Sequence, residues 1–255
     1  MPAGLSNSAV LRAFREARGA AGTGATLLVV GPMAEQLARE LAAGGDPGAA
    51  RTVGRPEDAD GLVVVLAGAP AEEEVELARR ATRANVPVAA VQLDPAHDAE
   101  VPYVLATDVV TCPPGEGFPV SALAAVLARR LGRRAYPLAA ALPRVREGIS
   151  AEATRQTATQ NALVALLPGS SSAHFPAMTL NQLRLALGVS VANGRELGRE
   201  GPVDAAAVLA GGLALRSLAR TVVPRLPVGR RLVRAAIAAG GTLALGEAAA
   251  RRPSL

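Results

Sequence analysis

Aromatic residues are scarce in this chain, and tryptophan is absent. Only 2% of its 255 residues are aromatic. Proteins that bind single-stranded nucleic acid stack the bases on exposed aromatic rings, so the composition disfavours that function. A core has to be packed mainly from alanine, valine and leucine. The hydrophobic content of 50% is enough to build one large or two modest globular domains.

Cysteine and histidine are almost as rare. The single cysteine, Cys112, cannot form an intramolecular disulfide and suits a reducing compartment. His97 and His174 have no second ligand three or four residues away, so the sequence predicts no metal site. The first residues lack the apolar core of a signal peptide, and their apolar side chains fall at helical spacing. We therefore expect a helix within residues 1–24 and a protein that stays on the cytoplasmic side.

Lysine is missing, so all 27 basic residues are arginine. Together with the abundance of alanine and glycine, this bias points to a GC-rich coding sequence rather than to nucleic-acid binding. The distribution of charge is more informative. Residues 1–149 carry 15 arginines and 17 acids, a net charge of −2, whereas residues 150–255 carry 12 arginines and 5 acids, a net charge of +7. This break predicts a domain boundary near residue 150.

Apolar strands alternate with amphipathic helices over residues 25–131, which predicts a mostly parallel α/β sheet with flanking helices. The expected strands are Thr26–Val30, a weak edge strand Ala50–Val53, Leu62–Leu66, Pro87–Leu93 and Val104–Val110. The expected helices are 33–41, 71–84 and 120–131.

The rest of the chain has a different pattern. Residues 132–149 contain Gly132, Pro137 and Pro143 and are expected to form a linker, with room for a short helix. Residues 150–252 are expected to form a mainly helical domain. Its helices are expected at about 150–167, 177–192, 203–223 and 228–250.

The turn after the first strand lacks the parts of a phosphate-binding loop. Gly31-Pro-Met-Ala-Glu-Gln36 has no second glycine, no lysine, and no serine or threonine. A P-loop, G-x-x-x-x-G-K-[ST], needs backbone N–H groups and a lysine to hold phosphate and a hydroxyl to hold magnesium. The sequence therefore predicts no catalytic residues and no cofactor at this position.

Three segments, in order along the chain, resemble the motifs of a Ras-like GTPase of the Era/Der type. Leu62–Leu66 corresponds to the third-motif strand, and Thr111–Phe118 is similar to the S-A-x-x-G-x-G loop. Val91-Gln-Leu-Asp94 keeps only the aspartate of the guanine-reading N-K-x-D. The resemblance implies a truncated, degenerate GTPase-like domain over residues 25–131 that does not hydrolyse GTP. Asp94 could still contact a base, but an aspartate before proline more often caps a loop.

Residues 150–250 resemble the bacterial YcjF-like domain of unknown function, which commonly follows such GTPase domains and is linked with membranes. The resemblance rests on Ala158-Thr-Gln-Asn161, the break at Leu167-Pro-Gly169, Thr179–Leu185 and Asn193-Gly194. It implies a helical, membrane-linked domain without a settled biochemical activity.

The last two expected helices contain apolar runs, Ala205–Leu215 and Ala235–Gly246. Both fall short of the roughly 20 residues that span a bilayer, so a buried or interfacial helical hairpin is the better interpretation. Small residues four apart, Ala207/Gly211 and Ala236/Gly240, have the spacing that lets helix backbones approach closely.

Between residues 205 and 246 the only charged side chains are arginines. They are Arg216, Arg220, Arg225, Arg230, Arg231 and Arg234. This cationic end of the hairpin suits anionic lipid head groups, where each basic residue adds roughly 1 kcal/mol. Two alternatives stay open. The arginines could be solvated or paired with the acids of Glu72–Glu76, or they could contact nucleic-acid phosphates.

Four amides lie among apolar residues on the expected helices: Gln160, Asn161, Asn181 and Gln182. Buried amides need hydrogen-bond partners, so we expect a network between helices. A ligand pocket is the alternative.

The sequence thus indicates a non-catalytic, membrane-associated interaction or regulatory protein, whose partner is an anionic membrane surface, another protein, or both. The first alternative is a nucleotide-binding or small-molecule-binding module around Gly31, Ala67 and Asp94, where the strands of parallel sheets end and such sheets bind ligands. The second is a soluble helical scaffold whose apolar hairpin packs against another subunit.

Overall fold

The computed structural model describes residues 6–94, 100–113, 115–167, 171–195 and 230–251. The chain divides into two compact units. One is Thr23–Ile149, called here the α/β unit, and the other joins Met1–Gly22 to Ser150–Leu255 and is called the helical unit. The N-terminal helix therefore belongs with the C-terminal helices, a grouping that sequence patterns did not indicate.

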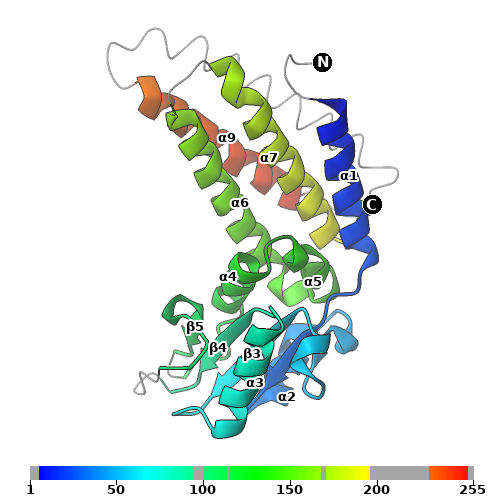
Figure 1. Ribbon diagram of the computed structural model, residues 1–255, viewed down its shortest axis with the longest axis vertical. Helices are drawn as coiled ribbons and strands as arrows, with labels where there is room; N and C mark the ends of the chain where they lie inside the picture. Colours follow the sequence, from blue (N-terminus) through cyan, green and yellow to red (C-terminus); the bar gives the residue numbers. More distant parts are fainter. Residues whose placement is uncertain (1–5, 95–99, 114, 168–170, 196–229, 252–255) are drawn as a thin grey trace. The chain divides into compact units, whose positions relative to one another are not determined.

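The α/β unit is built on a five-stranded sheet in which all strands are parallel, in the order β2-β1-β3-β4-β5 (Figure 1). The strands are β1 (Leu27–Val30), β2 (Ala50–Arg51), β3 (Gly61–Leu66), β4 (Val88–Gln92) and β5 (Val109–Thr111). This is a doubly wound order, with β2 on one side of β1 and the later strands on the other. The prediction of a mostly parallel α/β sheet is confirmed.

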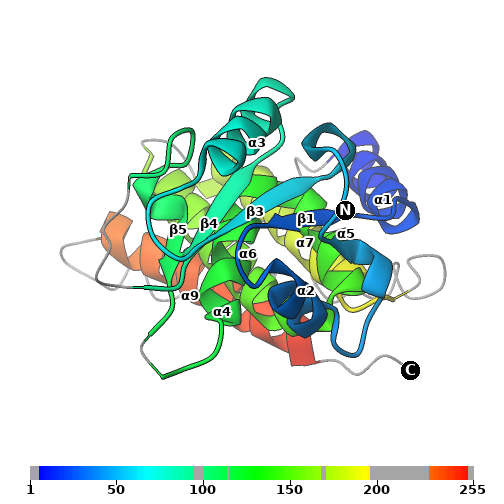
Figure 2. The same ribbon diagram turned by 90° about the horizontal axis from the view of Figure 1, so that it is seen from below.

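Helices cover both faces of the sheet. α3 (Glu72–Arg83) lies on one face, and α2 (Ala34–Ala42) and α4 (Val120–Leu131) lie on the other (Figure 2). Because both faces are covered, the central strands are apolar along their whole length. All six residues of β3 and all five of β4 are buried.

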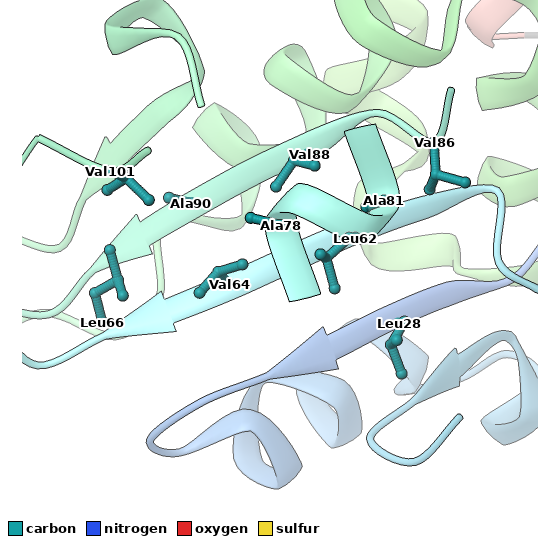
Figure 3. Close-up of a cluster of buried hydrophobic side chains, with 10 residues drawn as sticks. All are labelled: Leu28, Leu62, Val64, Leu66, Ala78, Ala81, Val86, Val88, Ala90 and Val101. Atoms are coloured by element: carbon teal, nitrogen blue, oxygen red, sulfur yellow. The ribbon is translucent and has the colours of Figure 1, made fainter. Parts of the chain in front are cut away.

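The core under α3 is made of small and branched aliphatic side chains (Figure 3). Leu62, Val64 and Leu66 of β3 face Ala78 and Ala81 of α3. The two alanines let the helix approach the sheet closely, so valine and leucine fill the layer without aromatic rings. The amino-acid composition predicted such a core, packed from aliphatic side chains.

Two expected elements differ from the structure. Within Val104–Val110 only the end is strand, because a 3₁₀ turn, Ala106–Asp108, places Asp108 in the interior. There the Asp108 carboxylate lies 3.2 Å from Nε of Arg130 on α4. That ion pair holds the segment in a turn and leaves only three residues for β5.

The second difference concerns residues 132–149, which were expected to form a linker with room for a short helix and are mostly helical. They contain a 3₁₀ turn (Gly132–Arg134), α5 (Ala135–Ala141) and the first turns of α6 (Pro143–Leu166). Leu138, Leu142 and Ile149 are fully buried there. Glycine and proline stand at helix starts and ends in this segment, and the apolar residues between them pack into the α/β unit.

The helical unit contains α1 (Asn7–Gly22), α6 from Ser150 onward, α7 (Ser171–Ala192) and α9 (Arg230–Arg251). α7 contacts both α1 and α9 (Figure 1). An ion pair at 3.7 Å joins Glu16 of α1 to Arg184 of α7. The helix expected at 203–223 lies outside the described residues.

Candidate functional site

The carboxyl ends of β1, β3 and β4 bring Gly31, Ala67 and Asp94 to one edge of the sheet. Gly31 has φ of +95°, a conformation that favours glycine. A Cβ atom at Gly31 would collide with the Val65 carbonyl and lie 2.9 Å from Oε1 of Glu74. The backbone of this loop is therefore packed directly against the end of β3 and a carboxylate.

Glu74 is held in place by its other oxygen, because Oε2 accepts a hydrogen bond of 2.8 Å from the Ala71 N–H. A fixed negative charge next to the loop repels phosphate, and Glu35 adds another acid in the first turn of α2. At the same edge, Ala67 is exposed and Asp94 is half-buried after β4. This edge lacks a cationic side chain in the turn after β1, which is where a phosphate-binding loop carries its lysine.

A pocket of about 480 Å³ opens at the opposite edge of the same sheet, where β1, β3 and β4 begin. It is lined by Thr23–Ala25, Glu57–Asp60, Ala84–Val86, Arg134 and Pro137. Two of its acids are engaged in local structure. Glu57 binds Arg80 through two hydrogen bonds of 2.9 and 2.8 Å, and Asp60 Oδ2 accepts from the Thr26 N–H at 2.9 Å. Sequence analysis did not single out these residues.

The helical unit contains the most connected polar cluster among the described residues. Thr242 Oγ1 of α9 accepts hydrogen bonds from Asn161 Nδ2 at 2.9 Å and from Gln182 Nε2 at 3.2 Å, and donates to the Ala238 carbonyl at 2.8 Å. Asn161 Oδ1 in turn accepts from Asn181 Nδ2 at 3.0 Å. The cluster joins α6, α7 and α9, and Asn161 and Thr242 are fully buried.

Three of the four amides singled out in the sequence therefore lie together, and Gln160 is exposed on α6. Thr242 was not singled out. A signal for it was present, because it is the only side chain with a hydrogen-bonding group in the run Ala235–Gly246. A polar group in so apolar a helix has to find partners when it is buried.

α9 is the one helix among the described residues that is long and apolar enough to cross a membrane, over Leu232–Arg251. Only 22% of its apolar stretch is buried. This stretch is longer than the twelve-residue apolar run Ala235–Gly246, because it includes residues at both ends of that run. Ala236 and Gly240 are exposed, and the helix expected to pack on them lies outside the described residues. Among the described residues, Gly246 makes a close approach, because its Cβ would collide with the side chain of Thr154.

Of the six arginines expected at the membrane surface, Arg216, Arg220 and Arg225 lie outside the described residues. Arg230 and Arg231 form the start of α9, and Arg234 is half-buried one turn later. Within the described acidic segment 72–76, Glu76 pairs with Arg79 at 2.5 Å. The described residues thus show Glu76 paired within its own helix.

Metal-binding side chains are dispersed in the part of the chain that the structure describes. Among the described residues, no three His, Cys, Asp or Glu side chains are placed to share a metal ion. Cys112 is buried, and desolvation raises the pKa of its thiol. His97 lies outside the described residues, and His174 is part of α7.

Comparison with protein families, with curated proteins and with solved structures finds no match for this chain.

Proposed function

We propose that this protein is a non-catalytic interaction protein that associates with the surface of a membrane through its helical unit. The observation that carries the proposal is α9, a long apolar helix of whose apolar stretch only 22% is buried. Contiguous apolar surface of this kind marks a binding site for another protein or for a membrane. The net charge of +7 on residues 150–255 favours an anionic membrane.

The α/β unit supports the non-catalytic part of the proposal. At the carboxyl edge of its sheet the loop after β1 packs against Val65 and beside the Glu74 carboxylate. Nucleotide binding would require phosphate oxygens near that carboxylate without a lysine in the loop to offset the repulsion. We infer that this unit serves as an interaction module rather than as a nucleotide switch.

The GTPase-like and YcjF-like relationships remain part of this proposal. The alternation of parallel strands and helices supports descent of the α/β unit from a nucleotide-binding fold, and β3 coincides with the expected third-motif strand. The order β2-β1-β3-β4-β5 is equally that of flavodoxin-like sheets, so architecture alone does not favour the GTPase.

The test is binding of the full chain to vesicles of phosphatidylcholine with and without phosphatidylglycerol, measured by sedimentation. We expect binding to the anionic vesicles at low salt and weaker binding as salt rises, because the arginines act through screened charge. Neutralising Arg225, Arg230 and Arg231 to glutamine should weaken binding by roughly 3 kcal/mol, about 100-fold, at low salt.

The matched control neutralises Arg12, Arg15 and Arg18, three exposed arginines on α1. This variant removes the same charge from the same unit and should weaken binding much less. Equal losses in both variants would assign binding to net charge alone. No binding to anionic vesicles at low salt would contradict the proposal and leave the soluble scaffold as the better description.

A further inference from the structure

α9 buries only small residues and leaves two of its leucines exposed. The residues that it buries are Ala235, Ala238, Thr242 and Gly246. Leu232 is 69% exposed and Leu243 is 46% exposed. They are eleven residues apart and so lie on one face of the helix, whereas Val233, Ile237 and Leu245 are half-buried. A helix that faces water has the reverse arrangement, because the largest apolar side chains gain most from burial.

The buried side of α9 meets its neighbours through small residues and hydrogen bonds. Ala235 and Ala238 pack on Ala165 of α6, Gly246 lies against Thr154, and Thr242 bonds the amides of Asn161 and Gln182. Small residues and side-chain hydrogen bonds are how helices associate where lipid surrounds them. The buried face of α9 is therefore packed by small residues and by hydrogen bonds between side chains, without large apolar side chains.

Charge is confined to the two ends of α9. Arg230, Arg231 and Arg234 are in its first turns, and Glu247 pairs with Arg251 at 2.6 Å in its last turn. The uncharged residues between them, Ala235–Gly246, extend about 18 Å along the helix axis. That length is well short of the hydrocarbon core of about 30 Å, so the charged ends would enter the core if the helix stood upright in the bilayer.

The neighbours of α9 further limit how it can meet a bilayer. α6 and α7 cover one side of it, and α6 exposes the polar side chains of Arg155, Thr159 and Gln160. While α9 stays packed on these helices, only its outward face can enter hydrocarbon. The last turns of α6 contact the start of α9 through Ala165. Two exposed leucines lie nearby, Leu163 within α6 and Leu167 just after its end.

We propose that α9 lies in the plane of an anionic bilayer, with the Leu232–Leu243 face immersed in the acyl chains and α6 and α7 on the water side. Helices that lie in this way have an apolar face in the boundary of the acyl chains and basic residues among the head groups. This inference rests on the proposed membrane association and specifies how the surface is bound.

The experiment places an environment-sensitive NBD label on cysteines introduced into the full chain. Leu243→Cys reports on the outward face of α9, and Leu11→Cys is the matched control, an exposed leucine on α1. The unmodified chain is the labelling blank, because its only cysteine, Cys112, is buried. With phosphatidylglycerol-containing vesicles we expect the NBD emission at position 243 to shift to the blue and to be quenched by doxyl-labelled lipid. Neither change is expected at position 11.

A second pair of labels, Leu232→Cys and Ala250→Cys, reports on the two ends of the helix. If α9 lies in the interface, dithionite added outside the vesicles bleaches both labels. Protection of one end would mean that α9 spans the bilayer and would overturn the inference. It would also be overturned if the label at 243 were shielded from aqueous iodide before vesicles are added, because a protein segment would then cover that face.

These outcomes separate the inference from the proposed function. Salt-sensitive sedimentation with vesicles, together with a label at 243 that lipid-borne quenchers do not reach, would retain membrane association and refute immersion of α9. Absence of sedimentation would refute both.

Discussion

At the scale of single residues, Thr242 is a buried polar side chain that joins three helices of the helical unit. Its hydroxyl group takes part in three hydrogen bonds, to Asn161, Gln182 and the Ala238 carbonyl. Such a buried network fixes which residues of three helices face each other, because any other register would leave amides without partners. Its energetic effect depends on what remains unpaired when one member is removed.

Replacing Thr242 with valine keeps the shape and removes the hydroxyl. Asn161 and Gln182 would each lose an acceptor in the interior, so we expect the free energy of unfolding to fall by about 1–3 kcal/mol. The control is Thr159→Val, because Thr159 makes the same bond to a carbonyl four residues earlier, at 3.0 Å, but on an exposed position. Urea unfolding of both variants checks this, and equal effects would contradict the network.

A second residue-scale prediction concerns pH. The hydrogen bonds from Arg80 hold the pKa of Glu57 below its ordinary value. The folded state therefore favours the charged carboxylate, and the stabilisation is present above the unfolded pKa and is lost as pH falls through the folded one. We expect Glu57→Gln to be less stable than the parent at pH 7, with a gap that closes toward pH 3.

This gap should be small and should shrink in high salt, because both partners are partly exposed. Glu116→Gln, on an exposed turn, serves as the control for loss of a surface acid. Urea unfolding at both pH values measures the gap. A gap that widened at low pH would have the wrong sign for an ion pair.

At the scale of elements, the packing of α9 on α6 depends on one glycine. A side chain at Gly246 would collide with Thr154, whereas Gly240 of the same helix has open space around it. Glycine costs helix stability, and at position 246 it leaves room for the Thr154 side chain. Substitutions at these two glycines therefore distinguish the effect of α9 packing on stability from the effect of its helix propensity.

We expect Gly246→Ala to destabilise the helical unit by about 1–3 kcal/mol through overpacking. Gly240→Ala should instead stabilise it by roughly 0.5–1 kcal/mol, because alanine is the better helix former. Thermal unfolding followed by circular dichroism measures both. The same sign for the two variants would mean that α9 does not pack on Thr154.

At the scale of the whole molecule, the protein combines an α/β unit without a phosphate cradle and a helical unit with a net positive charge over residues 150–255. The loop after β1 in the first unit lacks the P-loop motif. The second unit carries α9, an apolar helix with exposed leucines. We propose that binding by the helical unit carries the function.

Nucleotide should accordingly leave the stability of the full chain unchanged. A ligand present at 100 times its Kd stabilises a protein by about 2.7 kcal/mol, so tight binding would raise Tm visibly. We expect no rise with Mg-GTP in differential scanning calorimetry beyond that caused by the same concentration of Mg-pyrophosphate, which controls for ionic effects. A rise specific to GTP would favour the small-molecule-binding alternative around Gly31 and Asp94.

Sequence patterns alone located much of the fold. β3 and α4 occur within one residue of the expected ranges, and the weak edge strand at Ala50 is indeed the edge of the sheet. These features follow from hydrophobic periodicity, which is a local property of the chain. The structure differs from the expectation at residues 104–108 and 132–149. There the buried Asp108 carboxylate pairs with the partly exposed Arg130, and Leu138 and Leu142 pack in the interior.

The sequence by itself determined the absence of a P-loop, the aliphatic nature of the core and the charge break near residue 150. These features depend only on composition and on the order of residues along the chain. Tertiary structure alone decided that Glu74 stands beside Gly31, that Thr242 meets Asn161 81 residues away, and which face of α9 is left exposed. Such pairings depend on the shapes and hydrogen-bonding groups of segments that are distant in the chain. They form when helices and strands pack together, and local sequence patterns do not predict them.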